Sequence, residues 1–306
     1  MTEHTNIGEY EITSQLGAGG VSKVYKAKKQ GAFGFSKNFA IKVLLSRSEE
    51  ERSQFQPSFV SEAKVLSFFN HPNIVQVYEL NANQEEIFVV MDYIEGATLS
   101  QLLEKNQGPF PIEVALCLTQ EILNALQFMQ HHDLGGKKLT IVHGDISLQN
   151  IMVQNKTFIA KLNDFGFSRA VEFGKSARVQ PPVIGNPYYI SPEHMRCEWI
   201  DHRSDIYSLG IVLYDLLFNE RLFHYDLDEI KNLARRGQTI NRDNYVKLPF
   251  EVSKIISKMT ALNPDVRYQN PDEALFDIEN YLAKIQSVCS VRRLKTEFLL
   301  KFATAI

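Results

Sequence analysis

One short stretch of the sequence, residues 141–166, gathers the side chains best suited to phosphate and metal chemistry. Asp145 follows His143 with one residue between them, Asn150 comes five residues later, and Asp164 opens an Asp-Phe-Gly triplet. The acids and the amide adjoin apolar runs of the β type, which places their oxygen atoms at strand ends. Hard divalent cations such as Mg²⁺ take oxygen ligands and usually only one or two of them from the protein. The stretch therefore suits a site that holds metal ions on a polyphosphate.

The elements that must position these residues follow from hydrophobic periodicity. Strands are expected at residues 151–153 and 158–160 of this stretch, within 10–45 around a long connection at 30–38, and at 74–80 and 87–91. Helices are expected at 49–69, with Phe59, Ala63 and Leu66 on one face, at 112–132 and at 271–282. After Gly96 the pattern stays helical apart from the strands of the first stretch. A β-rich first third before an α-rich remainder predicts an α+β fold with two lobes that join near residues 92–96.

Composition narrows the class of protein. With 306 residues and 44% hydrophobic content, the chain can form one large domain or two lobes with separate cores. A net charge of −3 gives no global basic field, so we expect neither nucleic acid nor an anionic membrane as the main partner. Features of a signal peptide, a membrane-spanning run and a disulfide framework are all missing from the sequence, and we therefore expect a cytoplasmic location without membrane insertion.

A glycine-rich turn lies between two of the predicted strands. It consists of Leu16, Gly17, Ala18, Gly19, Gly20 and the residues up to Val24. Glycines let backbone N–H groups approach phosphate oxygens without a clash of Cβ atoms, and Val24 returns the chain to an apolar surface where a base could lie. A plain glycine hairpin fits the same residues. A Rossmann-type turn does not, because its glycines open a helix and these precede a strand.

Lys42 lies in an otherwise apolar strand, residues 40–43. An ammonium group is costly to bury without a partner, so this side chain needs an anion. The alternative is a lysine on an edge strand whose stem packs on the sheet while its charged end stays in water.

Together these motifs resemble those of bacterial eukaryotic-like, or Hanks-type, serine/threonine protein kinases. Further motifs in the family order are residues 185–193 (Gly-Asn-Pro-Tyr-Tyr-Ile-Ser-Pro-Glu), 205–210 (Asp-Ile-Tyr-Ser-Leu-Gly) and 263–267 (Asn-Pro-Asp-Val-Arg). The resemblance covers residues 10–282 and implies a protein-kinase-like fold. Its β-rich N-lobe with one helix would extend from about residue 10 to 91, its hinge from 92 to 96, and its mainly helical C-lobe from 97 to 282.

The resemblance also implies roles in ATP-dependent phosphoryl transfer to a protein substrate. Asp145 would accept the proton of the attacking hydroxyl. Asn150 and Asp164 would hold Mg²⁺, or Mn²⁺ in its place. Lys42 would clamp the α- and β-phosphates and pair with Glu62 on the following helix.

The implied nucleotide pocket uses backbone groups between apolar walls. The glycine turn would cover the phosphates, and backbone groups at Asp92 and Ile94 would bond the adenine edge. Met91 would gate the pocket behind the base. The walls would be Val24, Ala40 and Met152, of which Met152 also suits plain core packing.

Structural pairs are implied as well. Asp205 would brace the catalytic loop, and Arg267 would pair with Glu193.

Gly144 departs from the family pattern, which has an arginine before the catalytic aspartate. In the family that arginine pairs with a phosphate on the activation segment. In this chain the corresponding segment follows Gly166, and its hydroxyl-bearing residues before residue 185 are Ser168 and Ser176. We therefore predict activity that does not require their phosphorylation.

Three further residues depart from the pattern. Ser22 replaces the third glycine of the turn, and Ser147 replaces a lysine that touches the γ-phosphate. Asn186 replaces a threonine that bonds the catalytic aspartate, a bond that the Asn amide could still donate.

Two other functions stay open at this point. The departures suggest a pseudokinase or ATP-binding scaffold. The His-Gly-Asp triplet at residues 143–145 also resembles small-molecule kinases of the aminoglycoside and choline type, although these generally lack the Ser-Pro-Glu segment and its arginine partner.

The C-terminal tail, residues 283–306, continues with apolar side chains at helical spacing among basic ones. It predicts either a terminal helix whose apolar stripe packs on the helical lobe or a basic amphipathic docking helix for a partner protein.

Overall fold

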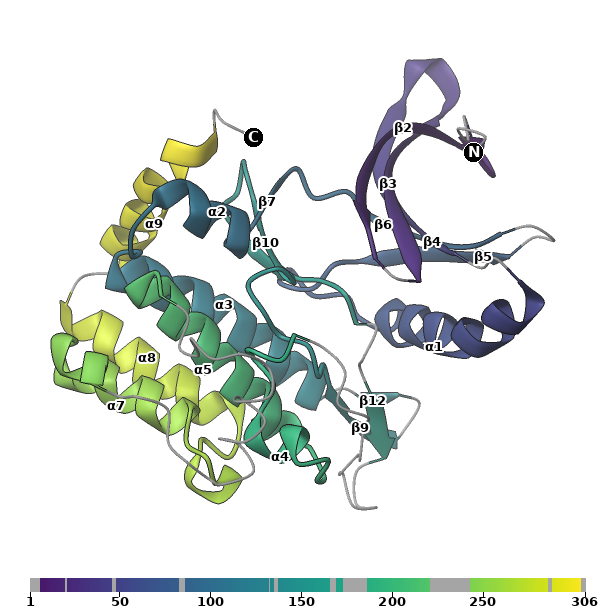
Figure 1. Cartoon of the computed structure of the whole chain (residues 1–306). Coiled ribbons are helices and arrows are strands. Elements are labelled where there is room, and N and C mark those ends of the chain that lie inside the picture. The colour runs from purple at the N-terminus through teal and green to yellow at the C-terminus, as the bar shows by residue number, and fades with distance from the viewer. Residues whose placement is uncertain are drawn as a thin grey trace. The chain divides into compact units, whose positions relative to one another are not determined.

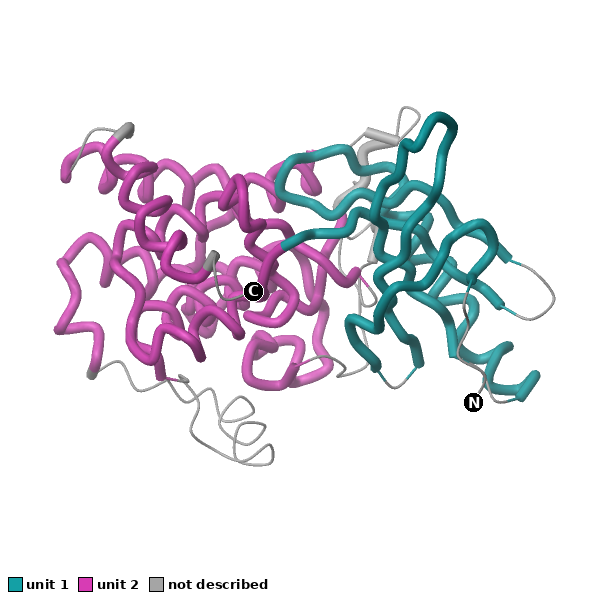
Figure 2. The backbone as a smooth tube through the Cα atoms, turned by 90° about the horizontal axis from the view of Figure 1, so that it is seen from above, with its two compact units in different colours: residues 1–95 teal, residues 96–306 magenta. Residues whose placement is uncertain are grey.

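The computed structural model describes residues 6–19, 21–45, 48–82, 86–131, 133–134, 137–165, 169–172, 186–220, 243–285 and 288–303. The chain divides into two compact units, Met1–Glu95 and Gly96–Ile306 (Figure 2). Strands dominate the first unit, and helices dominate the second. The predicted α+β class is therefore confirmed.

The first unit is built on a six-stranded antiparallel sheet with the strand order β1-β2-β3-β4-β6-β5 (Figure 1). Its strands are β1 (Asn6–Ile7), β2 (Tyr10–Ala18), β3 (Ser22–Gln30), β4 (Ser36–Leu44), β5 (Val77–Ala82) and β6 (Ile87–Asp92). The helix α1 (Glu49–Ser67) and the short 3-10 helix η1 (Ala32–Gly34) complete the described part of this unit.

Apolar side chains on one face of this sheet form a core. Its buried members are Ile7, Tyr10, Ala27, Ile41, Val43, Phe88 and Val90. The helix α1 packs against β4 and β5 and buries Phe59, Ala63 and Leu66, the face that its sequence predicted. Ser48 caps its N-terminus by accepting the N–H of Glu51, which satisfies one of the free donors of the first turn.

The second unit consists mainly of helices. They are α2 (Leu99–Asn106), α3 (Ile112–Gln130), α4 (Pro192–Met195), α5 (His202–Phe218), α7 (Phe250–Met259), α8 (Pro271–Ile285) and α9 (Val288–Ala303), with the 3-10 turns η2 (Asp243–Lys247) and η3 (Pro264–Val266). The helix α3 is central, because α5, α8 and α9 all pack on it. The mostly apolar α5 is buried almost all round, as expected for a core helix.

Two small antiparallel sheets belong to the second unit. One has the order β11-β10-β7 and consists of β7 (Gly96–Thr98), β10 (Ile151–Gln154) and β11 (Ala160–Leu162). The other has the order β12-β9-β8 and consists of β8 (Asp133–Leu134), β9 (Lys137–Val142) and β12 (Arg169–Glu172). The prediction of an all-helical remainder outside the first stretch was therefore wrong at β7, β8, β9 and β12, which are too short or too polar for a clear period-2 signal.

Several predicted boundaries also differ from the structure. The second strand of the β10–β11 hairpin begins at Ala160 rather than at Phe158, because Phe158 has a φ of +55° and lies in the turn. The connection between β3 and β4 spans only residues 31–35, since both strands extend further than their apolar patterns. The tail does not simply continue α8, which ends at Ile285 before α9 begins at Val288.

Within the described ranges, no helix combines the length and the apolar character that crossing a membrane requires.

Candidate active site

The loop between β9 and β10 carries the predicted catalytic residues, and an acid on α5 holds its backbone. The two carboxylate oxygens of Asp205 accept the N–H groups of His143, at 2.8 Å, and of Gly144, at 2.9 Å. Burial raises the pKa of Asp205 to about 7, although these two N–H donors lower it. Gly144 has a φ of +78°, a left-handed conformation that favours glycine over any residue with a Cβ. The predicted brace is thus present.

His143 connects this loop to the residue before Asp164, the acid predicted to bind a metal ion. Its Nδ1 accepts the N–H of Asp145 at 3.2 Å, so its Nε2 carries the hydrogen and donates it to the carbonyl of Asn163 at 3.2 Å. Its ring lies edge-to-face against Phe165 with centroids 4.4 Å apart. Burial lowers the pKa of His143 to about 4, so the imidazole is neutral at pH 7.

Hydrogen bonds to both of its oxygens fix the carboxylate of Asp145. Its Oδ1 accepts the backbone N–H of Asn186 at 3.1 Å, and its Oδ2 accepts Nδ2 of Asn150 at 2.7 Å. Burial raises the pKa of this carboxyl to about 6, and the charge of Asp164 adds to the rise, while both hydrogen bonds lower it. A carboxylate with a pKa close to neutrality and a fixed orientation suits a proton acceptor.

Asn186 bonds Asp145 through a different group from the one expected. Its backbone N–H makes the contact, while its side-chain amide donates to Gln149 at 3.4 Å and accepts the N–H of Tyr188 at 3.3 Å. The expectation of a side-chain donor was therefore wrong, because a backbone donor already occupies Oδ1 of Asp145.

Asn150 and Asp164 are tied to each other through the backbone. The carbonyl of Asn150 accepts the N–H of Asn163 at 2.9 Å, next to Asp164. Asp164 itself has a φ of +60°, a conformation that costs free energy in a non-glycine residue and is found mainly where the surroundings impose it. The structure thus places the backbone of Asp164 directly after a residue that is bonded to Asn150.

The donor atoms at these two residues fit a hard divalent cation. Nδ2 of Asn150 donates both to the carbonyl of Asp145, at 2.8 Å, and to its carboxylate, so the amide oxygen of Asn150 points in another direction. An amide oxygen and the carboxylate of Asp164 are the ligand types that Mg²⁺ and Mn²⁺ prefer. The residues present are therefore compatible with the implied metal.

Ser147 lies in the same loop and is buried. Its carbonyl accepts the N–H of Asn150 at 3.1 Å, which closes the turn that carries the amide.

In the first unit, Lys42 and Glu62 form the predicted ion pair. Nζ of Lys42 lies 2.7 Å and 2.9 Å from the two carboxylate oxygens of Glu62, and both side chains are largely buried. The strand β4 that carries Lys42 lies between β3 and β6. The alternative of a lysine on an edge strand was therefore wrong.

The glycine turn is a strand–turn–strand, as its sequence predicted. Gly17 pairs with Val24 across β2 and β3, and the N–H of Gly19 donates to the carbonyl of Ser22 at 2.8 Å. Leu16 and Ala18 are exposed and Val24 is half-buried. Gly20 lies outside the described residues, as do Ser168 and Ser176.

The residues expected around the base lie on both units. Ala40 pairs with Met91 across β4 and β6, and both are buried. The N–H of Asp92 donates to the carbonyl of Gln76 at 2.9 Å, and Ile94 is buried. Met152, half-buried on β10, belongs to the second unit. Their roles in nucleotide binding stay predictions.

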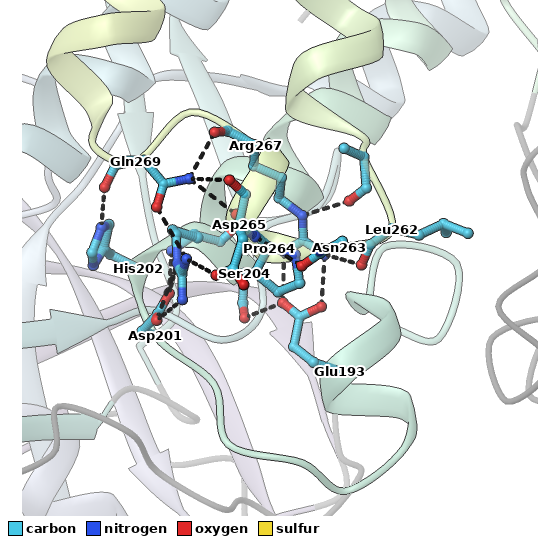
Figure 3. A network of polar contacts seen from close by, with 12 residues as sticks. Glu193, Asp201, His202, Ser204, Leu262, Asn263, Pro264, Asp265, Arg267 and Gln269 are labelled. Carbon is cyan, nitrogen blue, oxygen red and sulfur yellow. Dashed lines mark hydrogen bonds and ion pairs between the residues drawn. The ribbon is translucent and has the colours of Figure 1, made fainter.

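Arg267 and Glu193 form the predicted buried pair in the second unit (Figure 3). Nη1 and Nη2 of Arg267 each lie 2.6 Å from one carboxylate oxygen of Glu193, and Ser204 donates a further hydrogen bond to that carboxylate at 2.6 Å. Burial alone would raise the pKa of Glu193, but the hydrogen bonds and charge of Arg267 outweigh it and lower the pKa below its usual range.

Sequence reasoning missed two residues that support this site, Asn163 and Glu121. Asn163 acts through its backbone N–H and carbonyl, so its side chain gives no signal. Glu121 contacts the N–H of Ala160 from a helix 39 positions earlier, a separation that no local pattern reveals.

Comparison with known proteins agrees with this geometry. Residues 10–276 match the family model described as the protein kinase domain. A probable serine/threonine-protein kinase of Streptomyces coelicolor is 34% identical over 283 residues, which are 89% of this chain and 40% of that protein. The serine/threonine-protein kinases PknB of Mycobacterium leprae and PrkC of Bacillus subtilis are each 32% identical over 275 residues, covering 88% and 89% of this chain.

The chain spans about two fifths of the length of these relatives, 42% of PknB and 40% of PrkC. The resemblance to bacterial Hanks-type serine/threonine kinases that the motifs indicated is confirmed. With the family model matching most of its length, the chain belongs to the protein kinase family.

Proposed function

We propose that this protein transfers the γ-phosphate of ATP to a serine or threonine hydroxyl of a protein substrate. The observation that carries the proposal is the carboxylate of Asp145, which hydrogen bonds from Asn150 and Asn186 hold in one orientation. Burial raises its pKa to about 6. Phosphoryl transfer needs positioned groups and charge stabilisation more than covalent chemistry from the protein. This chain retains the groups for both tasks.

In the proposed reaction, Asp145 accepts the proton of the substrate hydroxyl. The hydroxyl oxygen forms the new bond to the γ-phosphorus while the bond from that phosphorus to the departing ADP oxygen breaks. Asn150 keeps Asp145 aimed at the hydroxyl, and its amide oxygen would join Asp164 in holding Mg²⁺ or Mn²⁺. The metal supplies positive charge that neutralises the phosphate oxygens.

Residues of the first unit would bind the nucleotide. Lys42, already oriented by Glu62, would contact the α- and β-phosphates, and backbone N–H groups from Gly17 to Gly20 would cover them. Met91, Asp92 and Ile94 would form the hinge that receives adenine, with Val24, Ala40 and Met152 as the apolar walls. A supply of ATP implies that this domain works in the cytoplasm.

The two other candidate functions have less support. A small-molecule kinase does not need the Glu193–Arg267 pair that fixes the Ser-Pro-Glu segment here. A pseudokinase would not need Lys42, Glu62, Asp145, Asn150 and Asp164 all to be retained.

Incubation with Mg·ATP and generic protein substrates tests the proposal, with Glu104→Ala on the exposed face of α2 as the control. We expect serine or threonine phosphorylation by the wild type and by the control, and loss of phosphorylation in Asp164→Ala and Asp145→Asn. Nucleotide binding by calorimetry without transfer would favour a scaffold. Transfer to aminoglycosides or choline but not to protein would favour a small-molecule kinase.

Independence from activation-segment phosphorylation is the second part of the proposal. It rests on Gly144, which lacks the guanidinium that the family uses to bind the phosphate. A Ser168→Ala/Ser176→Ala double variant is expected to keep its phosphotransfer activity. A folded double variant with almost none would contradict this.

A further inference from the structure

The C-terminal helix α9 lies beyond the end of the family match at residue 276 and packs on α3 (Figure 1). Its apolar side chains Val291, Phe298, Leu299 and Phe302 are buried, and the Phe298 ring lies 4.7 Å from that of Phe110. The chain's own helices therefore cover the apolar stripe of the tail, as the first of the two expectations for it required. A free amphipathic docking face is not what these residues provide.

Lys295 stands among these apolar residues, with a side chain only 8% exposed. Its Nζ lies 2.5 Å from Oε1 of Glu121 on α3. A buried ammonium needs such a partner, and removing one member of a buried ion pair leaves the other charge uncompensated. The pair therefore fixes the orientation of the Glu121 carboxylate.

The second oxygen of Glu121 reaches the strand that leads to the active site. Oε2 accepts the N–H of Ala160 at 2.8 Å. Ala160 begins β11, the edge strand of the β11-β10-β7 sheet, and it is fully buried. An edge N–H without a partner strand must be satisfied by another acceptor when it is buried, and the carboxylate of Glu121 performs that task.

From Ala160, two strand residues lead to Asn163 and Asp164. The segment is thus anchored at its start by the carboxylate of Glu121 and at its end by the carbonyl of Asn150, which accepts the N–H of Asn163. We propose that Lys295 is a positioning residue for Asp164, which acts by holding Glu121 on the N–H of Ala160. This inference rests on the proposed metal-binding role of Asp164, and it makes α9 part of the catalytic unit.

The physical reason is that Glu121 is only partly buried, with 25% of its side chain exposed. Without the cation of Lys295, the carboxylate of Glu121 is better solvated when it turns towards water, and its hydrogen bond with the N–H of Ala160 is then lost. The start of β11 would lose this anchor, and the segment that leads to Asp164, whose φ is +60°, would be held less firmly.

Three substitutions test this chain of contacts in the full-length protein. Lys295→Met removes the charge and keeps the length of the side chain, and Lys295→Arg keeps the charge. The double variant Glu121→Met/Lys295→Met removes both charges and leaves a well-matched apolar pair, a change that is often neutral or stabilising. Arg293→Met is the control on the same helix, because that side chain is 81% exposed and pairs only locally with Glu297.

The first readout is hydrogen exchange of the Ala160 amide, which needs neither nucleotide nor metal. We expect exchange at least about tenfold faster in Lys295→Met and in the double variant, with wild-type exchange in Lys295→Arg and Arg293→Met. The second readout is the Mg²⁺ concentration for half-maximal phosphotransfer. It should rise by about tenfold in the same two variants, the usual effect of losing a group that orients a metal ligand, with little change of kcat at saturating Mg²⁺.

The double variant separates positioning from stability. If it unfolds at the wild-type temperature and still shows fast Ala160 exchange and the raised Mg²⁺ concentration for half-maximal phosphotransfer, the inference stands. If Lys295→Met lowers only the unfolding temperature, and neither exchange at Ala160 nor the Mg²⁺ requirement changes, Lys295 is merely structural and the inference is overturned. An inactive wild type would refute the proposed function, and the exchange of Ala160 would still decide whether Lys295 holds this strand.

Discussion

Arg267 and Glu193 form two parallel hydrogen bonds of 2.6 Å each, although both side chains are almost completely excluded from water. The guanidinium also donates to the carbonyls of Ala261 at 2.6 Å, Leu262 at 3.1 Å and Arg203 at 3.1 Å. One arginine thus ties α4, the start of α5 and the loop after α7 together. Its planar set of five donors is matched to this arrangement.

Replacing Arg267 with Met should lower the free energy of unfolding by about 3–5 kcal/mol, because Glu193 would remain as a buried charge without a partner. Replacing it with Lys should cost nearly as much, since one ammonium group cannot satisfy the same acceptors. Urea titration followed by circular dichroism measures the change. The exposed Arg293→Met is the control and should change stability by less than about 0.5 kcal/mol. A loss below about 1 kcal/mol in Arg267→Met would contradict this account.

Gly96→Ala should be destabilising, although a strand is usually more stable with alanine than with glycine. A Cβ on Gly96 would lie 2.0 Å from the carbonyl oxygen of Val153 and 2.9 Å from its carbon, both in the backbone of the adjacent β10. Backbone in a sheet cannot yield as a flexible side chain can, so we expect a loss of at least about 2 kcal/mol. Gly108→Ala is the matched control, because the nearest atom to its Cβ would be 3.9 Å away. Equal unfolding temperatures for the two variants would argue against the clash.

Much of the fold could be predicted because its signals are local. The periodicity of residues 49–69 gave α1 and its buried face, and the glycines between alternating residues gave the β2–β3 turn. The pairs Lys42–Glu62 and Glu193–Arg267, by contrast, join residues far apart in the chain. Their partners were identified only because the order of the motifs resembles that of a known family.

The remainder could not be predicted because it depends on backbone geometry or on tertiary contacts. Nothing in the sequence at Asn186 indicates that its N–H, rather than its side chain, would bond Asp145. The residues of β9 lack a clear period-2 pattern. The strand forms nevertheless, because pairing with β12, a tertiary contact, stabilises it. The contact between Glu121 and Lys295 joins two helices separated by most of the second unit, and each residue alone resembles an ordinary surface charge.

Ser191→Ala should leave stability unchanged or raise it by up to about 1 kcal/mol. Ser191 precedes α4 at the N-cap position, yet its Oγ is buried and has no hydrogen-bond partner among the described residues. Alanine removes a polar atom whose burial is costly, and no cap is lost. Thr98→Ala provides the contrast, because Thr98 accepts the N–H of Gln101 in the capping box of α2 and its loss should cost about 1 kcal/mol. Differential scanning calorimetry distinguishes the two, and a marked loss in Ser191→Ala would show that its hydroxyl has a partner.

His143 should make the stability of the second unit depend on pH between about 4 and 6.5. Burial lowers its pKa to about 4 in the folded protein, from 6.5 as the ordinary value. As pH falls below 6.5, the unfolded chain takes up a proton at this residue and the folded protein does not. The contribution of His143 is therefore fully present above pH 6.5 and is lost as pH falls towards 4, by about 3 kcal/mol over the whole window.

Two measurements check this linkage. In the folded protein, the imidazole resonances of His143 should show no protonation in an NMR titration down to about pH 5. The free energy of unfolding of His143→Gln should fall less steeply between pH 6.5 and 4.5 than that of the wild type, because the variant lacks this proton uptake. The variant also loses the contacts with Asp145 and Asn163, which changes its stability at every pH. The test is therefore the slope of the free energy of unfolding with pH, not its absolute value. An imidazole that titrates near pH 6.5 in the folded state would show that the neutral His143 does not join these two residues as described.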